Sequence, residues 1–427
     1  MEEWKEYKVA DVIEDISMGP FGSNIKRDNY VDSGVPYLNG SNLSSYKLNE
    51  NSFNYVTEEK ANNLGRCVAK RGDIIVTHRG TIGQISYIPN DSIYERYLTG
   101  NSQFRLTVNR KVIRPDFFVY YFHTRMGQYR ILANASQVGV PALARPTSTF
   151  KEVLVPVPKM EIQNKIMGIL LSLDDKIAVN RRICENLEAQ AQALFKHWFI
   201  DFAPFKNGNF CANREQNETS FNSAEVQPKI TGKACKFVES ELGMIPEGWR
   251  VGGLFDIAEV HDSKRKPLSG MQRAKMKKVY PYYGATEQMD MVDDYIFDGR
   301  YVLMGEDGSV VRENGLPYIQ YVWGKIWVNN HAHVLTGKNG FTTEMLIPFL
   351  TTYNIKGLVT GAVQAKLNQA NMAKISLAIP PLSILENISV LFESLYDTYR
   401  NCCTEMVTLS TLRDTLLPKL MSGQIKV

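Results

Sequence analysis

Two long stretches of the sequence carry apolar residues that recur with a helical period. In the first, residues 160–199, the apolar positions alternate mainly between steps of three and four, which is the spacing of one seam of a coiled coil. A continuous helix of about 40 residues would extend roughly 60 Å. Charged residues fill the positions between the seam residues, as expected for a solvated face.

The same pattern returns 222 positions later, so that Leu395 corresponds to Leu173. One irregularity, a step of four followed by another step of four around Leu173, recurs around Leu395. One such helix would also suit the core of a globular domain, but two copies predict an internal duplication whose long helices pack on each other. The predicted helix-pairing seam consists of Ile166, Leu173, Ile177, Leu187 and Leu194 in the first copy, and of Ile388, Leu395, Leu409 and Leu416 in the second.

Asn180 fills one position of the first seam. A polar residue there can set the register of the two helices. It can equally be an ordinary exposed asparagine near a helix irregularity, and the sequence leaves both interpretations open.

The composition is that of a globular protein with more than one core. The chain has 427 residues, of which 44% are apolar and 22% charged, and its formal net charge is +4. This mild excess of positive charge permits nucleic-acid binding without arguing for it. The six cysteines form no C-x-x-C pair and predict free thiols. Without a signal-like N-terminus or a membrane-length apolar run, we expect a cytoplasmic protein.

The remainder of each half indicates short strands with few helices. Gly72–Val76 enters a hairpin whose tip is 78–84, and Gly299–Gly308 takes the same place in the second half. Residues 115–129 have a helical pattern. Since no alternation of strands and helices is visible, we predict an α+β fold.

The motifs of most catalytic chemistries are absent from the sequence. No phosphate-binding loop, dinucleotide-binding glycine pattern or Asn-Pro-Pro-aromatic run occurs. Pro115-Asp116 is not followed by a Glu-x-Lys at the spacing of a metal nuclease. His331 and His333 lie two apart in a predicted strand and are either a metal pair or, as we expect, ordinary hydrogen-bonded histidines.

Clusters of basic and amide side chains fall in the predicted loops. Such residues neutralise phosphates or reach base edges, although a solvated surface explains the 264–278 run about equally well. The candidate DNA-binding residues are Lys26, Arg27, Arg79, Thr81, Gln84 and Gln137 in the first half, and Lys264, Arg265, Lys266, Arg273, Lys275, Arg312, Gln364 and Lys366 in the second.

With these features, the chain resembles the specificity (S) subunit of type I restriction-modification systems over nearly its whole length. The resemblance rests on the duplicated plan, the restart at Glu241–Trp249, the Gly72–Val76 hairpin and the proline-then-helix endings at 156–199 and 380–421. The second hairpin departs from the pattern, because Gly299-Arg300 replaces Gly-Asp.

The resemblance implies two target recognition domains that each read one part of a split DNA sequence, separated by two long helices paired as an antiparallel coiled coil. It also implies that this chain is not catalytic and binds no cofactor. Two methyltransferase (M) subunits and restriction/translocase (R) subunits would act on the double-stranded DNA, using S-adenosylmethionine, ATP and magnesium.

The expected organisation is target recognition domain 1 at 1–158, a central long helix at 159–203, a flexible linker at 204–244, target recognition domain 2 at 245–380, and a C-terminal long helix and tail at 381–427. Two alternatives stay open at this point. One is a self-contained DNA methyltransferase or nuclease with degenerate motifs, and the other is a coiled-coil adaptor without DNA contact.

Overall fold

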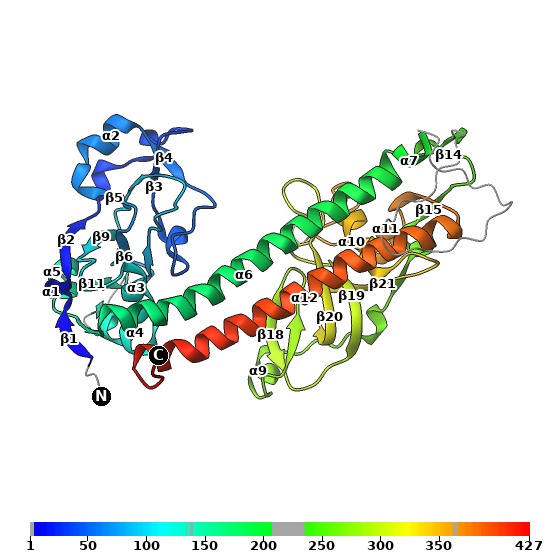
Figure 1. The fold of residues 1–427 in the computed structure, drawn as a ribbon. Coiled ribbons are helices and arrows are strands. Elements are labelled where there is room, and N and C mark those ends of the chain that lie inside the picture. The colour runs from blue at the N-terminus through cyan, green and yellow to red at the C-terminus, as the bar shows by residue number, and fades with distance from the viewer. Residues whose placement is uncertain (1–3, 134, 137–139, 207–234, 362–364) are drawn as a thin grey trace. The chain divides into compact units, whose positions relative to one another are not determined.

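The computed structural model describes residues 4–427 apart from 134, 137–139, 207–234 and 362–364 (Figure 1). The chain divides into two compact units, and each is described by itself. Unit 1 comprises Met1–Val179 and Glu405–Val427, and unit 2 comprises Asn180–Thr404. The long helices α6 (Met160–Phe195) and α12 (Leu382–Met421) therefore each contribute residues to both units.

Unit 1 contains two four-stranded sheets. The first is antiparallel with the order β2-β9-β6-β7, and its strands are β2 (Ile13–Met18), β6 (Ile74–Thr77), β7 (Ile85–Tyr87) and β9 (Gln103–Val108). The second has the order β4-β3-β8-β5, with β3 (Val35–Tyr37), β4 (Asn54–Val56), β5 (Val68–Lys70) and β8 (Arg96–Leu98). The β-branched run Ile74–Thr77 is buried throughout, which is why it forms a central strand.

Two consecutive helices, α3 (Pro115–His123) and α4 (Arg125–Leu132), occupy the stretch predicted as one helix. Thr124 separates them, because its Oγ1 donates to the carbonyl of Tyr121 and accepts from the backbone N–H of Gly127 at 3.0 Å, capping α4. The remaining short elements of unit 1 are α2 (Glu58–Asn63), β10 (Ala135–Ser136), β11 (Ala142–Leu143) and α5 (Pro146–Lys151).

Unit 2 is built on one six-stranded sheet with the order β16-β21-β19-β20-β17-β18. Its strands are β16 (Ala258–Val260), β17 (Tyr280–Tyr283), β18 (Gln288–Val292), β19 (Phe297–Gly305), β20 (Ile319–Val328) and β21 (Ala332–Gly337). Helix α10 (Thr343–Thr352) packs its buried residues into the core of this unit. The shorter elements are α7 (Ala203–Lys206), β13 (Phe237–Ser240), β14 (Gly243–Pro246), α9 (Gly270–Ala274) and α11 (Gln369–Met372).

The same frame closes both units. In unit 1, β1 (Lys5–Lys8) pairs antiparallel with β12 (Leu154–Val157), and α1 (Val9–Val12) follows β1. In unit 2, β15 (Arg250–Gly253) pairs in the same way with β22 (Ser376–Ile379), and α8 (Leu254–Ile257) follows β15. The second strand of each ribbon leads directly into a long helix. We call this ribbon, short helix and long helix the frame of a unit.

The sheets repeat the duplication within the frames. The order β2-β9-β6-β7 of unit 1 corresponds to β16-β21-β19-β20 of unit 2, and a buried helix follows the second strand of each set. The predicted duplication and the α+β class are therefore confirmed. The hairpin at Gly72–Gly83 corresponds to β19 and β20 despite the departure at Gly299-Arg300.

Segments of α6 and α12 pair antiparallel inside each unit. In unit 1, Asp174 of α6 accepts a hydrogen bond from Arg413 of α12 at 2.7 Å, and Lys176 lies 3.4 Å from Glu405. In unit 2, the sulfur atoms of Cys184 and Cys403 are 3.7 Å apart. The residue numbers of the pairs rise along α6 as they fall along α12, which is the signature of antiparallel helices.

The seam itself is more regular than the sequence pattern indicated. Leu170 is fully buried, whereas the predicted Ile169 is 38% exposed. Likewise Phe392 is buried in place of Leu391, which is half-buried. The predicted irregularity of the seam was wrong. Ile169 and Leu170 are adjacent apolar residues, as are Leu391 and Phe392, and only packing decides which member of each pair is buried. Of the predicted seam, Ile166, Ile177 and Ile388 are buried, and Leu173, Leu187, Leu194, Leu395, Leu409 and Leu416 are half-buried.

Two further sequence interpretations concern particular segments. Asn180 is fully buried, so the interpretation as an exposed asparagine is wrong. The predicted linker 204–244 lies mainly outside the described residues, but at its ends the chain forms α7 and the β13–β14 ribbon. Among the helices of the described residues, none is long and apolar enough to cross a membrane.

Candidate nucleic-acid interface

The loops at one end of the β2-β9-β6-β7 sheet converge in unit 1. Strands β2 and β6 end beside the start of β9, because Met18 pairs with Phe104 and Thr77 pairs with Gln103. The backbone N–H of His78 continues this pattern by donating to Ser102 at 2.9 Å. We define the loop edge of unit 1 as residues 19–29, 78–84, 100–102 and 141–143.

The hairpin tip 78–84 is held from two sides. The backbone N–H of Gly80 donates to the carbonyl of Pro141 and that of Leu143 donates to the carbonyl of His78, both at 2.9 Å, so the tip pairs with residues 141–143. From α4, the side-chain amide of Gln128 donates to the carbonyl of Gly83 at 2.9 Å. The tip is therefore positioned by the fold rather than by its own sequence alone.

The candidate residues of unit 1 gather on this loop edge. Lys26, Arg27, Arg79 and Thr81 are exposed. Gln84 is half-buried, and its Oε1 accepts a hydrogen bond from Thr81 Oγ1 at 2.7 Å, which leaves the amide nitrogen of Gln84 as a donor. Gln137 lies outside the described residues.

Unit 2 repeats the arrangement of tip and loop with different side chains. The backbone N–H of Gly308 donates to Ala365 at 3.0 Å, and that of Leu367 donates to Glu306 at 2.8 Å. Residues 307 and 366 form the bridge that 79 and 142 form in unit 1. We define the loop edge of unit 2 as residues 261–266, 306–318, 329–331 and 365–367. Gln364 lies outside the described residues.

A nearly enclosed network of charged groups holds the loop edge of unit 2. Arg265 donates to Glu306 Oε2 and to the carbonyl of Ala332, both at 2.7 Å, and only 11% of its side chain is exposed. His333 lies between Asp262, at 2.6 Å from Nδ1, and the carbonyl of Leu367, at 2.7 Å from Nε2. Arg265 thus acts inside the protein, joining the end of β16 to the starts of β21 and the tip.

The titration of Asp262 reflects this network. Burial alone would raise its pKa, but hydrogen bonds from His333 and Gln369, together with the nearby imidazole, lower its pKa overall. The charged carboxylate is therefore the stable form in the folded unit.

His331 and His333 do not act as a pair. His331 contacts Asp307, whereas His333 turns into the buried network. Within the described residues, one group with metal-ligand geometry is found, namely Asp262, Glu306 and His333, whose ligand atoms lie within 4.8 Å of one another. Arg265 already contacts both carboxylates of this group, so the expected hydrogen-bonded interpretation fits the chemistry better than a metal site.

The other candidates of unit 2 fall into two classes. Arg273 is engaged, because its guanidinium lies 3.1 Å from Asp290 and stacks over Tyr282 at 4.8 Å from the ring centre. Five candidates are exposed, and they are Lys264, Lys266, Lys275, Arg312 and Lys366. Of these, Arg312 lies over the ring of Tyr318, and Lys366 is 3.8 Å from Glu306.

The sequence interpretation missed exposed apolar side chains near these cations. Phe21 is 81% exposed at the loop edge of unit 1, and Met271 is 80% exposed in α9 of unit 2. The signal in the sequence is that Phe21 stands between the turn-forming residues of a Gly-Pro-Phe-Gly run, which indicates a loop.

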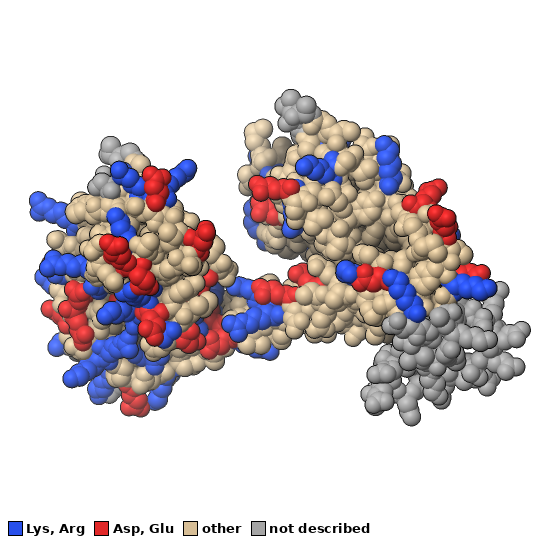
Figure 2. Space-filling model, turned by 90° about the horizontal axis from the view of Figure 1, so that it is seen from above, with Lys and Arg blue, Asp and Glu red and all other residues tan. Residues whose placement is uncertain are grey.

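The charges seen in Figure 2 do not form a field of one sign. On the visible face of unit 1, Lys and Arg side chains are interspersed with Asp and Glu, and uncharged residues cover more of the visible face of unit 2. Any attraction for phosphates therefore depends on the local cations of the loop edges, since oppositely charged neighbours cancel at longer range.

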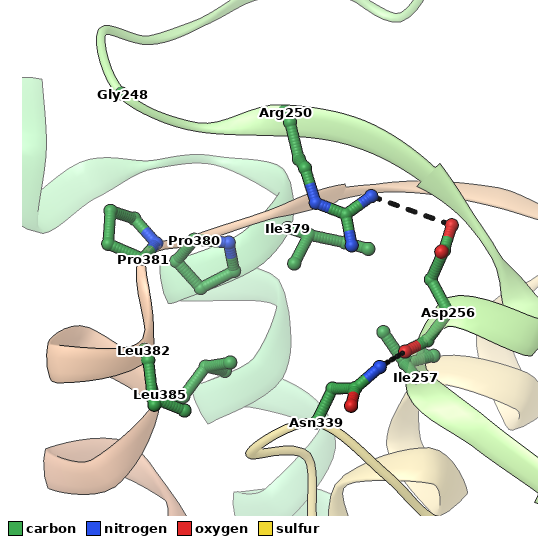
Figure 3. Close-up of a pocket in the computed structure, with 10 residues that line it drawn as sticks. All are labelled: Gly248, Arg250, Asp256, Ile257, Asn339, Ile379, Pro380, Pro381, Leu382 and Leu385. Carbon is green, nitrogen blue, oxygen red and sulfur yellow. Dashed lines mark hydrogen bonds and ion pairs between the residues drawn. The ribbon is translucent and has the colours of Figure 1, made fainter.

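A separate hollow of about 290 Å³ lies in the frame of unit 2 (Figure 3). Arg250 and Asp256 face each other across it, 3.5 Å apart, and Asn339 donates to the carbonyl of Asp256 at 2.8 Å. Pro380 and Pro381 close the side where α12 begins. The hollow belongs to the strand-and-helix junction, and its lining includes no residue of the loop edge.

Comparison with known proteins finds sequences that are similar to this chain over its whole length. A sequence profile described as type I restriction modification DNA specificity domain matches residues 1–189 and 246–401. The MjaIX specificity subunit of a type I restriction enzyme from Methanocaldococcus jannaschii is 26% identical, and the alignment covers 100% of this chain and 94% of that protein. The HindI specificity subunit from Haemophilus influenzae is 24% identical, with 100% of both chains covered.

The fold has a counterpart among solved structures. The S subunit of a type I restriction-modification system from M. genitalium superposes with a TM-score of 0.55 at 15% identity, covering 98% of this chain and 96% of that one. At this identity the likeness concerns the fold alone. The profile, however, matches both repeats and well over half of the sequence. The chain therefore belongs to the type I restriction-modification DNA specificity family.

Proposed function

We propose that each unit reads one part of a two-part double-stranded DNA target through its loop edge. The observation that carries this proposal is the repeated arrangement of tip and loop, in which 79 and 142 in unit 1 correspond to 307 and 366 in unit 2. The backbone plan is the same at both edges, but the side chains differ. Two copies of one scaffold with different side chains suit two different half-sites.

The exposed side chains of the edges provide both kinds of contact that sequence-specific binding needs. Exposed lysines and arginines such as Lys26 and Lys264 neutralise phosphates and fix the register on the duplex. The amide of Gln84 and the guanidinium of Arg79 have donors suited to base edges in the major groove. Arg265 instead shapes the edge of unit 2 from within, and Arg273 is engaged with Asp290 outside this edge.

The proposal assigns catalysis to partner proteins. In it, methyltransferase subunits and restriction/translocase subunits bind S-adenosylmethionine, ATP and magnesium, while this chain supplies recognition. Exposed apolar side chains on the long helices support a docking role, because Val390 and Val407 of α12 are 61% and 68% exposed. An adenine-directed reaction would then follow wherever the two half-sites are bound.

A map of modified adenines in the host genome, with and without this chain, tests the proposal. We expect a split motif that disappears on deletion and returns on complementation. Replacing residues 1–158 by the matching segment of another family member should change one half of the motif only. A change in both halves would contradict independent reading by the two units.

Purified proteins distinguish the alternatives. We expect methylation only when the methyltransferase subunits are present, and binding that weakens as salt rises. Methylation by this chain alone would establish an enzyme. Absence of DNA binding even in the assembled complex would leave the adaptor interpretation.

A further inference from the structure

Phe21 is the most exposed large apolar side chain of the described residues, at 81%. A single exposed apolar residue needs no functional explanation by itself. Phe21 differs in its setting, because it lies on the loop edge of unit 1 among candidate DNA-binding cations. The following observations concern its backbone and its neighbours.

The backbone around Phe21 is fixed by the sheet. The N–H of Gly19 donates to Gln103 at 2.8 Å, which extends the pairing of β2 with β9. A Cβ on Gly19 would lie 2.0 Å from the carbonyl oxygen of Gly100, so only glycine permits this approach. Pro20 then restricts the next φ angle, and the N–H of Asn24 donates to the carbonyl of Phe21 at 2.8 Å. The outward position of the ring is therefore determined by the fold.

Exposed cations follow Phe21 in the sequence and follow the neighbouring strand exit. Lys26 and Arg27 are exposed a few residues after Phe21, with Ile25 buried before them, and Arg79 is exposed just after the end of β6. The strand order places β9 between β2 and β6, so their exits are separated by two strand spacings, about 10 Å. That distance corresponds to about three base steps along one DNA strand. The exit that leads to Phe21 and the exit that leads to Arg79 are thus separated by a distance on the scale of a half-site.

We propose that Phe21 inserts as a wedge between stacked base pairs of the half-site read by unit 1. This inference rests on the proposed function. Apolar side chains inserted in this way unstack a step and kink the duplex, and the added protein contacts offset the loss of stacking. In unit 2, the segment leaving β16 carries Lys264 and Lys266 at the corresponding place, so its half-site is read without a wedge.

The test uses the assembled complex with its methyltransferase subunits and the target found by the methylation map. 2-Aminopurine replaces each adenine of the two half-sites in turn, and its fluorescence reports unstacking. The methyltransferase subunits flip the adenines that they modify, so those positions are left out of the comparison. At the other positions we expect, with the wild-type chain, a fluorescence rise at one step of the half-site read by unit 1, and none in the other half-site.

The variants separate the wedge from its surroundings. Phe21→Ala should abolish the rise and weaken target binding about tenfold, whereas Phe21→Trp should retain both. Met271→Ala is the matched control, since Met271 is equally exposed in unit 2, and it should change neither quantity. Lys26→Ala should weaken binding and reduce its salt dependence while the fluorescence rise persists.

Three results would overturn the inference. One is a Phe21→Ala complex whose affinity and fluorescence equal those of the wild type. Another is loss of complex assembly on a sizing column with Phe21→Ala, which would assign the ring to a protein contact. The third is a wild-type complex that does not bind the mapped target, and this result alone would also refute the proposed function.

Discussion

The two loop edges have the same backbone plan but are stabilised by different chemistry. Unit 1 relies on backbone pairing, close glycine packing and amide hydrogen bonds, as at Gly19 and Gln128. Unit 2 relies on an ion network in which Arg265 joins Asp262 and Glu306. One topology is therefore compatible with either a neutral or a charged interior at its edge.

This difference explains how the edges can diverge while the frames do not. The ribbon β1–β12 and the ribbon β15–β22 use backbone hydrogen bonds in the same antiparallel arrangement. Backbone pairing tolerates many side chains, so the frame persists. The loops satisfy their polar groups with side chains, and a complete replacement of one set by another changes what the edge presents to a ligand.

The largest expected effect on stability comes from disrupting the ion network at the loop edge of unit 2. Arg265→Ala removes the guanidinium that joins two poorly exposed carboxylates, Asp262 and Glu306, and we expect unit 2 to lose about 3–5 kcal/mol of its free energy of unfolding. Urea unfolding followed by tryptophan fluorescence suits this test, because four of the five tryptophans lie in unit 2. Lys264→Ala removes an adjacent, exposed charge and should change stability by less than about 0.5 kcal/mol. Equal losses for the two variants would show that the network contributes nothing.

The loop edge of unit 1 should be destabilised by a steric clash, because it does not depend on a charged network. Gly19→Ala places a Cβ against the backbone of Gly100, and we expect a loss of about 1–3 kcal/mol in unit 1. Gly22→Ala is the matched control, because its Cβ would meet only the Asn101 side chain at 3.7 Å. Hydrogen exchange of peptides from β6 and β9 measures unit 1 separately. Unchanged protection in Gly19→Ala would mean that the edge relaxes without cost.

A smaller effect is expected on the salt dependence of DNA binding when an exposed lysine of the loop edge is removed. In the assembled complex, Lys264→Ala should reduce the slope of log affinity against log salt by about 1. Lys236→Ala makes the same charge change in unit 2 away from its loop edge and should leave the slope unchanged. Identical slopes for both variants would place the DNA contact elsewhere on unit 2.

The smallest expected effect is a pH dependence carried by His123 of unit 1. Burial lowers the pKa of His123 in the folded unit, and its ring Nε2 contacts the carbonyl of Ile85 at 2.7 Å. Arg413 lowers this pKa further, whereas Asp174 raises it, and the ring of Tyr46 packs against the imidazole.

As the pH falls below about 6.5, the unfolded state binds a proton before the folded state does, so stability present above that pH is lost. His123→Gln should reduce this loss, as measured by hydrogen exchange at pH 7.5 and 5.5. A part should remain, because burial also lowers the pKa of His78 in unit 1. In unit 2, burial also lowers the pKa of His261, so His261→Gln should affect unit 2 without changing the response of unit 1. A wild-type unit 1 that is equally protected at both pH values would contradict the prediction.

The sequence by itself determined the duplication, the α+β class and the two long helices. Each of these depends on spacing along the chain, and Leu173 with Leu395 shows the repeat without knowledge of any contact. The correspondence of the hairpins at Gly72 and Gly299 also followed from their order in the chain.

Only the tertiary structure decided which side chains face inward. Ile169 and Leu170 are both apolar neighbours, and contact with the rest of unit 1 selects Leu170. Arg265 was indistinguishable from Lys264 and Lys266 in sequence, yet Glu306, 41 positions away, draws it into the protein. Spacing is a local property that a sequence displays directly, whereas burial and ion pairing depend on partners that the chain brings together from distant positions.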